Sequence, residues 1–211
     1  MTTVSPYATS SRPEIHPLVP RTAQRILDVG CNDGGFGTWL QQDAPGRVVW
    51  GIEPVTTQAE IARQSYAGVV IGLYPEALGQ IDGDFDCITF NHVLEHMVDP
   101  WGALAQTRQR LTSDGCVIAV IPNIRYITAL ADLAFRGRWE YQDSGLLDRT
   151  HLRFFTRASI RPLFEDAGLR VDRLSPVNGF ASVSHPLLSH VASRIFGDTT
   201  FGGFAVRARR H

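Results

Sequence analysis

The sequence predicts an α/β protein in which a parallel sheet is covered by helices on both faces. Short apolar runs at 26–29, 48–52, 69–71, 85–90 and 116–121 have the length and composition of buried strands. Segments with helical spacing of apolar residues lie between most of these runs, and glycine or proline marks many of their ends. Strands that alternate with helices in this way are typical of a parallel sheet with both faces buried.

The composition is that of an ordinary globular protein. The chain has 211 residues, of which 44% are hydrophobic, so it fits a single domain over 1–211 with a substantial core. A net charge of −1 gives no reason to expect nucleic acid or an anionic membrane as a partner. All 20 basic residues are arginine, which excludes a lysine Schiff base or a lysine general base. Cys31, Cys87 and Cys116 are scattered and odd in number, and we interpret them as reduced buried residues.

Targeting signals are not evident in the sequence. No apolar run approaches the roughly 18–20 residues of a membrane span. Residues 1–20 are polar and interrupted by proline, without the charged start and apolar centre of a signal peptide. We therefore expect a soluble, cytoplasmic protein. We also expect a monomer or a homodimer.

The segment 1–22, which precedes the first strand, has two interpretations. It can form a short helix that packs over the edge of the sheet. Alternatively it lies over a ligand pocket as a lid, with Tyr7 and Arg12 facing the substrate. The sequence favours neither.

The first strand leads into a glycine-rich turn, and 26–37 reads Ile-Leu-Asp-Val-Gly-Cys-Asn-Asp-Gly-Gly-Phe-Gly. A strand, a glycine turn and a helix allow the backbone to approach a cofactor closely. No basic group is placed to meet a pyrophosphate, which disfavours a dinucleotide. The spacing resembles motif I of the class I S-adenosylmethionine (SAM)-dependent methyltransferases, with asparagine at the usual middle glycine. This resemblance implies that the cofactor contacts Asp28, Gly30, Cys31, Asn32 and Gly34.

The second strand ends in Glu53 and Pro54. An acid about 20 residues after the glycine turn is where this topology places a carboxylate against a ribose diol, so both residues are predicted cofactor contacts. At the end of the third strand, methyltransferases often carry an acid that binds adenine. Here that position is Leu73, so adenine recognition would fall to backbone groups and apolar contacts of Leu73 and Tyr74.

The fourth strand releases polar residues at its end, where ligands bind in open α/β sheets. The stretch 91–100 resembles the fourth-strand motif of the same superfamily, which implies that Asn91 and His92 line the methionine end of SAM. Some ubiquinone-pathway O-methyltransferases hold a divalent ion with Glu-x-x-Glu-His at this place. This chain has His92-x-x-Glu95-His96, so we predict no metal, although one stays possible. Glu95 and His96 can instead simply stabilise the start of a helix.

The segment 123–156 interrupts the alternation of strands and helices. Residues 124–135 can be helical, and the rest is long, polar and aromatic without strand or helix period. Long loops of this kind are usually functional or disordered, and the aromatic residues argue against disorder. We predict an insertion that covers the substrate.

Side chains of this insertion are candidates for acceptor binding and catalysis. Tyr141 can stack on a sugar ring or pack beneath the loop. Asp148 and Arg149 can bind acceptor groups or pair with each other. A hydroxyl acceptor needs a group that takes its proton; His151 is the first candidate and His92 the second, unless each imidazole only orients a loop.

The remaining elements follow the same patterns. Helices are expected over 56–66, capped by Thr56 or Thr57 with Ile61 and Ala62 facing inward, over 101–111, and after Thr156. A strand over 169–174, a possible helix over 187–196 and a strand over 201–209 complete the chain. An antiparallel last strand beside 169–174 would complete the seven-stranded, Rossmann-like sheet of class I methyltransferases.

Taken together, the chain resembles bacterial class I methyltransferases that are often encoded with, or fused to, glycosyltransferases. The resemblance runs from Tyr7 to the last strand, and 145–156 with Arg12-Pro-Glu is its most distinctive part. It implies SAM as cofactor, S-adenosyl-L-homocysteine (SAH) as product, and a hydroxyl of a glycan or sugar-related metabolite as acceptor. A non-catalytic SAM-binding or regulatory protein and a nucleotide-dependent oxidoreductase are the alternatives. The base-flipping motif of nucleic-acid methyltransferases is absent.

Overall fold

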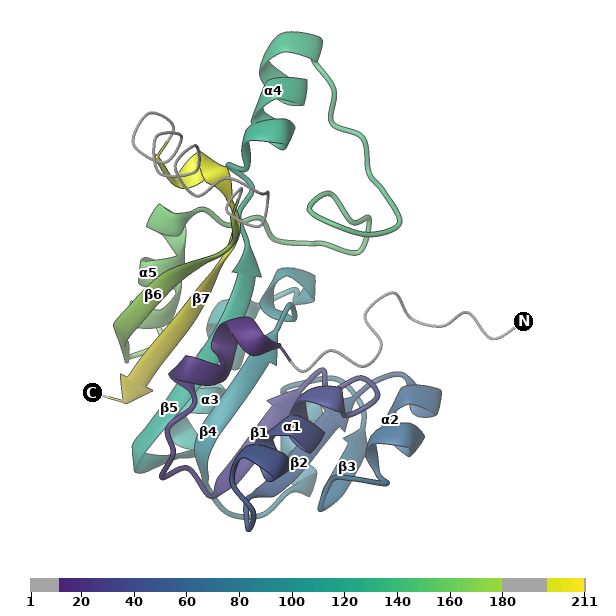
Figure 1. Ribbon diagram of the computed structural model, residues 1–211, viewed down its shortest axis with the longest axis vertical. Helices are drawn as coiled ribbons and strands as arrows, with labels where there is room; N and C mark the ends of the chain where they lie inside the picture. The colour runs from purple at the N-terminus through teal and green to yellow at the C-terminus, as the bar shows by residue number, and fades with distance from the viewer. Residues whose placement is uncertain (1–11, 180–196, 211) are drawn as a thin grey trace.

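The computed structural model describes residues 12–179 and 197–210. Tyr7 and the possible helix over 187–196 lie outside these residues. The core of the molecule is one seven-stranded sheet with the order β3-β2-β1-β4-β5-β7-β6 (Figure 1). The strands are β1 (Arg25–Val29), β2 (Val48–Glu53), β3 (Gly68–Ile71), β4 (Phe85–Asn91), β5 (Leu111–Pro122), β6 (Leu169–Gly179) and β7 (Phe201–Arg210).

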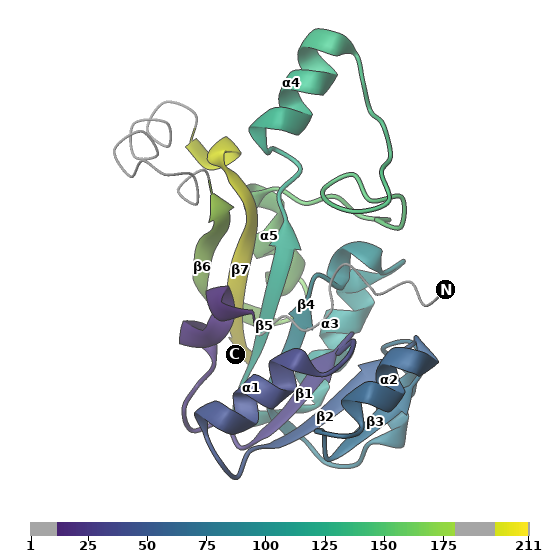
Figure 2. The ribbon, with the colours of Figure 1, turned by 45° about the vertical axis from the view of Figure 1, so that its right-hand side comes forward.

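Strand β7 is the one antiparallel member of this sheet. It lies between β5 and β6 and pairs antiparallel with both, whereas β1 to β5 pair parallel with one another. The predicted fold class, a mostly parallel sheet completed by an antiparallel last strand, is therefore confirmed. Figures 1 and 2 show the parallel strands pointing toward the same end of the molecule, so their carboxyl ends form one edge.

Helices cover both faces of the sheet, as predicted. Alternate residues of a strand point to opposite faces, and Ile26 and Leu27 accordingly belong to two different apolar clusters. One cluster packs beneath η1, α1 and α2, and the other beneath α3 and α5. The helices are η1 (Pro13–Leu18), α1 (Gly35–Asp43), α2 (Thr56–Ala62), η2 (Glu76–Gln80), η3 (Leu94–His96), α3 (Pro100–Gln109), α4 (Ile127–Arg136), α5 (Arg157–Glu165) and η5 (Gly197–Thr200).

The sequence predicted helix α5 better than helix α2. Thr156 caps α5 in a capping box with Ser159, as its sequence pattern indicates. Helix α2 instead ends at Ala62, its N-cap has no side-chain hydrogen bond, and Ile61 is 48% exposed. The prediction of a threonine cap, an inward Ile61 and a helix through Tyr66 is therefore wrong, whereas the predicted inward position of Ala62 is confirmed. The chain leaves the helix early, and the turn that follows buries Tyr66 in the core.

Two other predicted boundaries also differ. Strand β5 begins at Leu111, where we predicted the end of a helix, because residues after α3 already pair with β4 through an irregular register. Strand β6 extends beyond the predicted 169–174 because β7 pairs along its full length.

The segment before β1 packs on the sheet, and its first described residue reaches a ligand cleft. Ile15 and Leu18 of η1 are buried, and the His16 ring stacks on Trp39 of α1. Arg12, just before η1, adopts a left-handed conformation with φ 53°. The packing interpretation of this segment thus has direct support from its buried residues.

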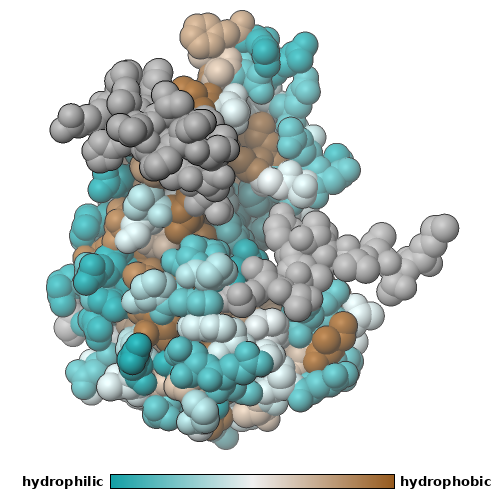
Figure 3. All heavy atoms as spheres, viewed as in Figure 1, coloured by the Kyte–Doolittle hydropathy of each residue, from teal (hydrophilic) through white to brown (hydrophobic). Residues whose placement is uncertain are grey.

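The insertion projects from the carboxyl end of β5. Helix α4 has no buried residue and stands away from the sheet in both ribbon views (Figure 2). Hydrophobic side chains show on this part of the surface in Figure 3, where Leu133 and Phe135 are exposed. None of the helices within 12–179 and 197–210 has the length and apolarity needed to cross a membrane.

Candidate functional site

The glycine turn after β1 has a conformation that requires glycine. Gly30 has φ 68° and its amide donates to the Ile52 carbonyl over 2.8 Å. A Cβ at Gly30 would lie 2.6 Å from Cγ2 of Val93, so a side chain there would collide with the segment after β4. Gly34, with φ 84°, is the N-cap of α1 and packs against Ala62. The turn is therefore pressed between β2 and β4.

Glu53 at the end of β2 holds the turn through both carboxylate oxygens. Oε2 accepts from the Asn32 amide over 2.9 Å, and Oε1 accepts from the Val55 amide over 2.9 Å. The side chain is 6% exposed. Each oxygen keeps a second lone pair, so the arrangement leaves capacity for the two hydroxyls of a ribose. Pro54 is exposed beside it.

Asp28 accepts hydrogen bonds from two side chains, Tyr66 after α2 and Thr89 of β4. Its Oδ2 accepts from the Tyr66 hydroxyl over 2.8 Å, and its Oδ1 accepts from the Thr89 hydroxyl over 2.7 Å. The Tyr66 hydroxyl in turn accepts from the Gly37 amide. Burial raises the pKa of Asp28 to about 6, although the Thr89 and Tyr66 hydrogen bonds oppose the rise. Asp28 thus has a structural role as well as a place in the cleft.

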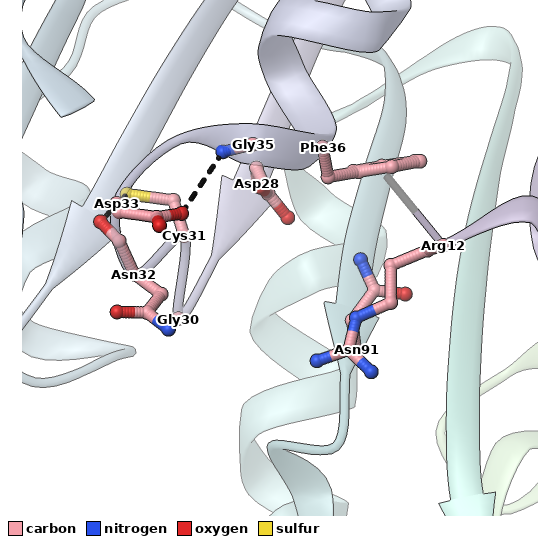
Figure 4. A pocket seen from close by; sticks show the side chains of 9 residues that line it. All are labelled: Arg12, Asp28, Gly30, Cys31, Asn32, Asp33, Gly35, Phe36 and Asn91. Carbon is pink, nitrogen blue, oxygen red and sulfur yellow. Dashed lines mark hydrogen bonds between the residues drawn. The ribbon is translucent and has the colours of Figure 1, made fainter. Parts of the chain in front are cut away.

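A cleft opens beside this turn and contains about 290 Å³ of empty space, part of it open to solvent. Figure 4 shows the Arg12 and Asn91 side chains next to each other, across from residues 30–33 of the glycine turn, with the Phe36 ring above them. Asn91 is 8% exposed, and its Oδ1 has no hydrogen-bond partner among the described residues. The lining residues are Arg12, Asp28, Gly30, Cys31, Asn32, Asp33, Gly35, Phe36 and Asn91.

Five of the eleven predicted cofactor contacts line this cleft. The predicted residues Asp28, Gly30, Cys31, Asn32 and Asn91 all line it, together with Arg12, which was predicted to face substrate. Gly34 lies in the turn behind the lining. Asp33, Gly35 and Phe36 also line the cleft but were not predicted, although their place between the turn and the start of α1 was a signal.

The two predicted contacts after β3 differ in exposure, since Leu73 lies on the surface and Tyr74 in the core. Leu73 is 68% exposed and can cover a ligand. Tyr74 is 8% exposed and its ring meets Phe90 edge-on, while its hydroxyl lies 2.7 Å from that of Thr107. The Tyr74 side chain therefore points into the core and leaves only its backbone at the strand end.

The end of β4 presents a second group of polar side chains. His92 has φ 58° and its Nδ1 lies 3.3 Å from Oε1 of Glu95. This distance suits an ion pair, but the contact lacks hydrogen-bond geometry. Glu95 is 1% exposed, and neither of its carboxylate oxygens has a hydrogen-bond donor among residues 12–179 and 197–210.

The insertion folds back onto this end of β4. The Glu95 carbonyl accepts from the amides of Leu152 and Arg153 over 2.8 and 3.0 Å. His151 is 7% exposed, and its ring lies 4.7 Å, centroid to centroid, from that of His96. The two histidines predicted as bases, His92 and His151, therefore both lie near Glu95.

Other predicted acceptor contacts lie on the insertion. Oδ1 of Asp148 accepts from the amide and hydroxyl of Thr150; burial raises the pKa of Asp148, but these bonds outweigh it and the pKa falls below its ordinary value. Arg149 pairs with Asp143 over 2.8 Å on the surface, and not with Asp148. Tyr141 is 51% exposed. The interpretation in which 148 and 149 pair with each other is therefore wrong.

Comparison with known proteins agrees with this architecture. A family model described as a methyltransferase domain matches residues 7–174. A SAM-dependent methyltransferase from Archaeoglobus fulgidus superposes with a TM-score of 0.69 at 16% identity, covering 93% of this chain and 91% of that one. A possible histamine N-methyltransferase from Thermotoga maritima gives 0.63 at 17% identity, covering 93% and 86%.

Curated relatives match part of the chain, and their names give no activity. One from Mycobacterium tuberculosis is 29% identical over 163 residues, which is 74% of this chain and 50% of the relative. One from Streptomyces fradiae, encoded in a transposon, is 31% identical over 113 residues, 50% of this chain and 32% of the relative. The chain thus spans half or less of the length of these relatives.

The fold and the matched model together define a class of protein. The sheet has the fold of the class I, SAM-dependent methyltransferases, as the superposition on such an enzyme shows. This chain belongs to the methyltransferase domain family.

Proposed function

We propose that this chain binds SAM in the cleft beside the glycine turn and transfers its methyl group to a hydroxyl of a small polar acceptor. The observation that carries the proposal is Oδ1 of Asn91, which has no hydrogen-bond partner among the described residues and lies in the same cleft as Arg12. A buried acceptor without a donor costs about 1–3 kcal/mol. The methionine end of SAM offers an ammonium to Asn91 and a carboxylate to Arg12.

The other predicted cofactor contacts fit the adenosine half. Glu53 has the remaining lone pairs for a ribose diol, and the turn backbone beside it is held in place by the same carboxylate. Leu73 offers an exposed apolar surface at the end of the neighbouring strand. The cleft holds no cluster of cations for a pyrophosphate, since Arg12 is the single arginine in its lining.

The residues at the end of β4 supply the proton chemistry. SAM provides an electrophilic methyl group: as the acceptor oxygen bonds to that carbon, the carbon–sulfur bond breaks and its electron pair stays on sulfur, leaving SAH. The acceptor proton must leave to a base. We propose His92 for this role, because the Glu95 carboxylate beside Nδ1 can orient the ring and stabilise its cation. His151 is the other candidate.

The acceptor is proposed to bind beneath the insertion 123–156, where the cleft with Arg12 in its lining opens. Tyr141 and Arg149 are exposed on the insertion and would contact acceptor groups. The family grouping suggested by 145–156 favours a glycan or sugar-related hydroxyl. A mitomycin 7-O-methyltransferase also shares this fold, at a TM-score of 0.59, 18% identity, and coverage of 90% of this chain and 49% of that one.

Two measurements test the proposal. Calorimetry should show that SAH binds and NAD does not, and Asn91→Leu should weaken SAH by about tenfold. A panel of sugars and nucleotide sugars should then yield SAH from SAM. Tight binding of NAD would contradict the cofactor assignment. SAH binding without turnover on any acceptor would instead favour the non-catalytic alternative.

A further inference from the structure

We propose that Glu95, His96 and His151 form a binding site for one divalent transition-metal ion. One ligand atom from each residue lies within 4.8 Å of the other two. Ligand atoms at about 2.0–2.2 Å from one ion are at most about 4.4 Å apart. The three side chains therefore need to move only slightly to close around an ion.

The strongest observation is the state of the Glu95 carboxylate. It is 1% exposed, and both of its oxygens lack hydrogen-bond donors in the described part of the chain. A buried carboxylate is expensive unless it is paired or coordinates a metal. His92 Nδ1 lies 3.3 Å from Oε1 but outside hydrogen-bond geometry, and it leaves Oε2 without any partner. A cation between Glu95 and the two imidazoles would satisfy this group.

The imidazoles of His96 and His151 are each fixed by a hydrogen bond from one ring nitrogen to a backbone carbonyl, as is common for metal-binding histidines. Nδ1 of His96 lies 3.2 Å from the Thr150 carbonyl, and Nδ1 of His151 lies 3.0 Å from the Leu146 carbonyl. A carbonyl oxygen only accepts, so both Nδ1 atoms carry the proton. Each neutral ring therefore keeps its lone pair on Nε2, which no hydrogen bond among the described residues occupies. Donation of the second ring nitrogen to a carbonyl is the usual support of a ligating histidine.

A second layer of contacts makes the site rigid. The Thr150 hydroxyl lies 3.1 Å from Nδ1 of His96 and donates to Oδ1 of Asp148 over 2.7 Å. Backbone amides of the insertion donate to the Glu95 carbonyl, which fixes His151 beside it. This set differs from the sequence motif considered above, since His92 is not a ligand and the third ligand comes from the insertion.

The donor set selects the class of ion. Two imidazole nitrogens and one carboxylate suit Zn²⁺, Mn²⁺, Fe²⁺ or Co²⁺, whereas Mg²⁺ and Ca²⁺ favour oxygen ligands. Three protein ligands leave a position open, and His96 is exposed, so solvent reaches the site. A bound ion would lower the pKa of a hydroxyl placed there. Metal binding needs neither SAM nor an acceptor, so it is tested independently of the proposed methyl transfer.

The test is titration of the full chain with Zn²⁺ alone, in competition with a chromophoric chelator. We expect one ion per chain, and an affinity at least about 100-fold weaker in Glu95→Gln, His96→Asn and His151→Asn. His16→Asn is the matched control, since this histidine stacks on Trp39 of α1, and it should bind as the wild type does. Thr150→Ala should weaken Zn²⁺ about tenfold, an effect that adventitious surface binding would not show.

The melting temperature with Zn²⁺ and the absorption spectrum with Co²⁺ test the same site if one of the variants is unstable. Zn²⁺ should raise the melting temperature of the wild type and of His16→Asn but not that of Glu95→Gln. Co²⁺ should give visible absorption bands in the wild type that are lost in His151→Asn. Absence of stoichiometric Zn²⁺ binding by the wild type, or unchanged affinity in Glu95→Gln, would overturn the site.

Discussion

The glycine turn and the end of β4 lie side by side but differ in whether their polar groups have hydrogen-bond partners within the protein. In the turn, both oxygens of Asp28 and both oxygens of Glu53 accept hydrogen bonds from the protein itself. At the end of β4, Oδ1 of Asn91 and both oxygens of Glu95 have no hydrogen-bond partner in the described residues. The carboxylates around the turn are therefore already bonded within the protein, whereas the end of β4 presents polar groups that we expect ligands to partner.

The largest effect should come from breaking the packing at Gly37. A Cβ there would lie 2.2 Å from the Tyr66 ring, so Gly37→Ala should displace that ring and its hydrogen bonds. We expect a loss of about 2–4 kcal/mol in unfolding free energy, measured by denaturant titration. Gly79→Ala, where no atom lies within 4 Å, should change stability by less than about 0.5 kcal/mol. Equal losses in both variants would contradict the account.

Asp28 should make the stability of the protein depend on pH. Its folded pKa is about 6 against an ordinary 3.8, so between these values the unfolded chain has released a proton that the folded chain retains. Unfolding free energy should therefore fall by about 2–3 kcal/mol as pH rises from about 4 to 6. Denaturant titrations of wild type and Asp28→Asn should differ in this slope. A slope that persists in Asp28→Asn would assign it to another group.

Replacing Asn91 should stabilise the ligand-free protein but weaken its binding of SAH. Asn91→Leu removes an unpartnered buried acceptor, so the ligand-free protein should gain about 1 kcal/mol in unfolding free energy. The same change should weaken SAH by about tenfold in calorimetry. A loss of stability with unchanged SAH affinity would give Asn91 a structural role instead.

The smallest effect is expected on the exposed insertion. Arg149 pairs with Asp143 at the surface, where ion pairs contribute about 0–1 kcal/mol. Arg149→Ala should leave the melting temperature nearly unchanged and raise the KM for the acceptor. A change in stability with no change in KM would exclude Arg149 from the acceptor site.

The parts of the fold and of the candidate site that follow from local sequence patterns could be predicted, whereas contacts between distant segments could not. The turn at 26–37 and the acid at Glu53 are local patterns, and alternation of strands and helices predicts the sheet that joins them. The contact of Tyr66 with Asp28 was not predictable, because the helical pattern of α2 runs through 66 while the chain leaves it at Ala62. Tyr74 faces the core because a partner on α3 is available, which only the tertiary structure specifies.

The insertion shows the same limit more strongly. Its polarity and its aromatic residues predict that 123–156 is a functional segment, but they do not predict where it folds back. The approach of His151 to Glu95 depends on backbone hydrogen bonds from Leu152 and Arg153. Backbone bonds of this kind carry no sequence pattern, so a site shared between two distant segments cannot be read from either alone.

A crystal structure of the chain with SAH tests the central claim most directly. The account predicts the ligand's amino group within hydrogen-bond distance of Oδ1 of Asn91, and its ribose hydroxyls at the Glu53 carboxylate. SAH bound at another place, or a cleft that stays empty at saturating SAH, would contradict it.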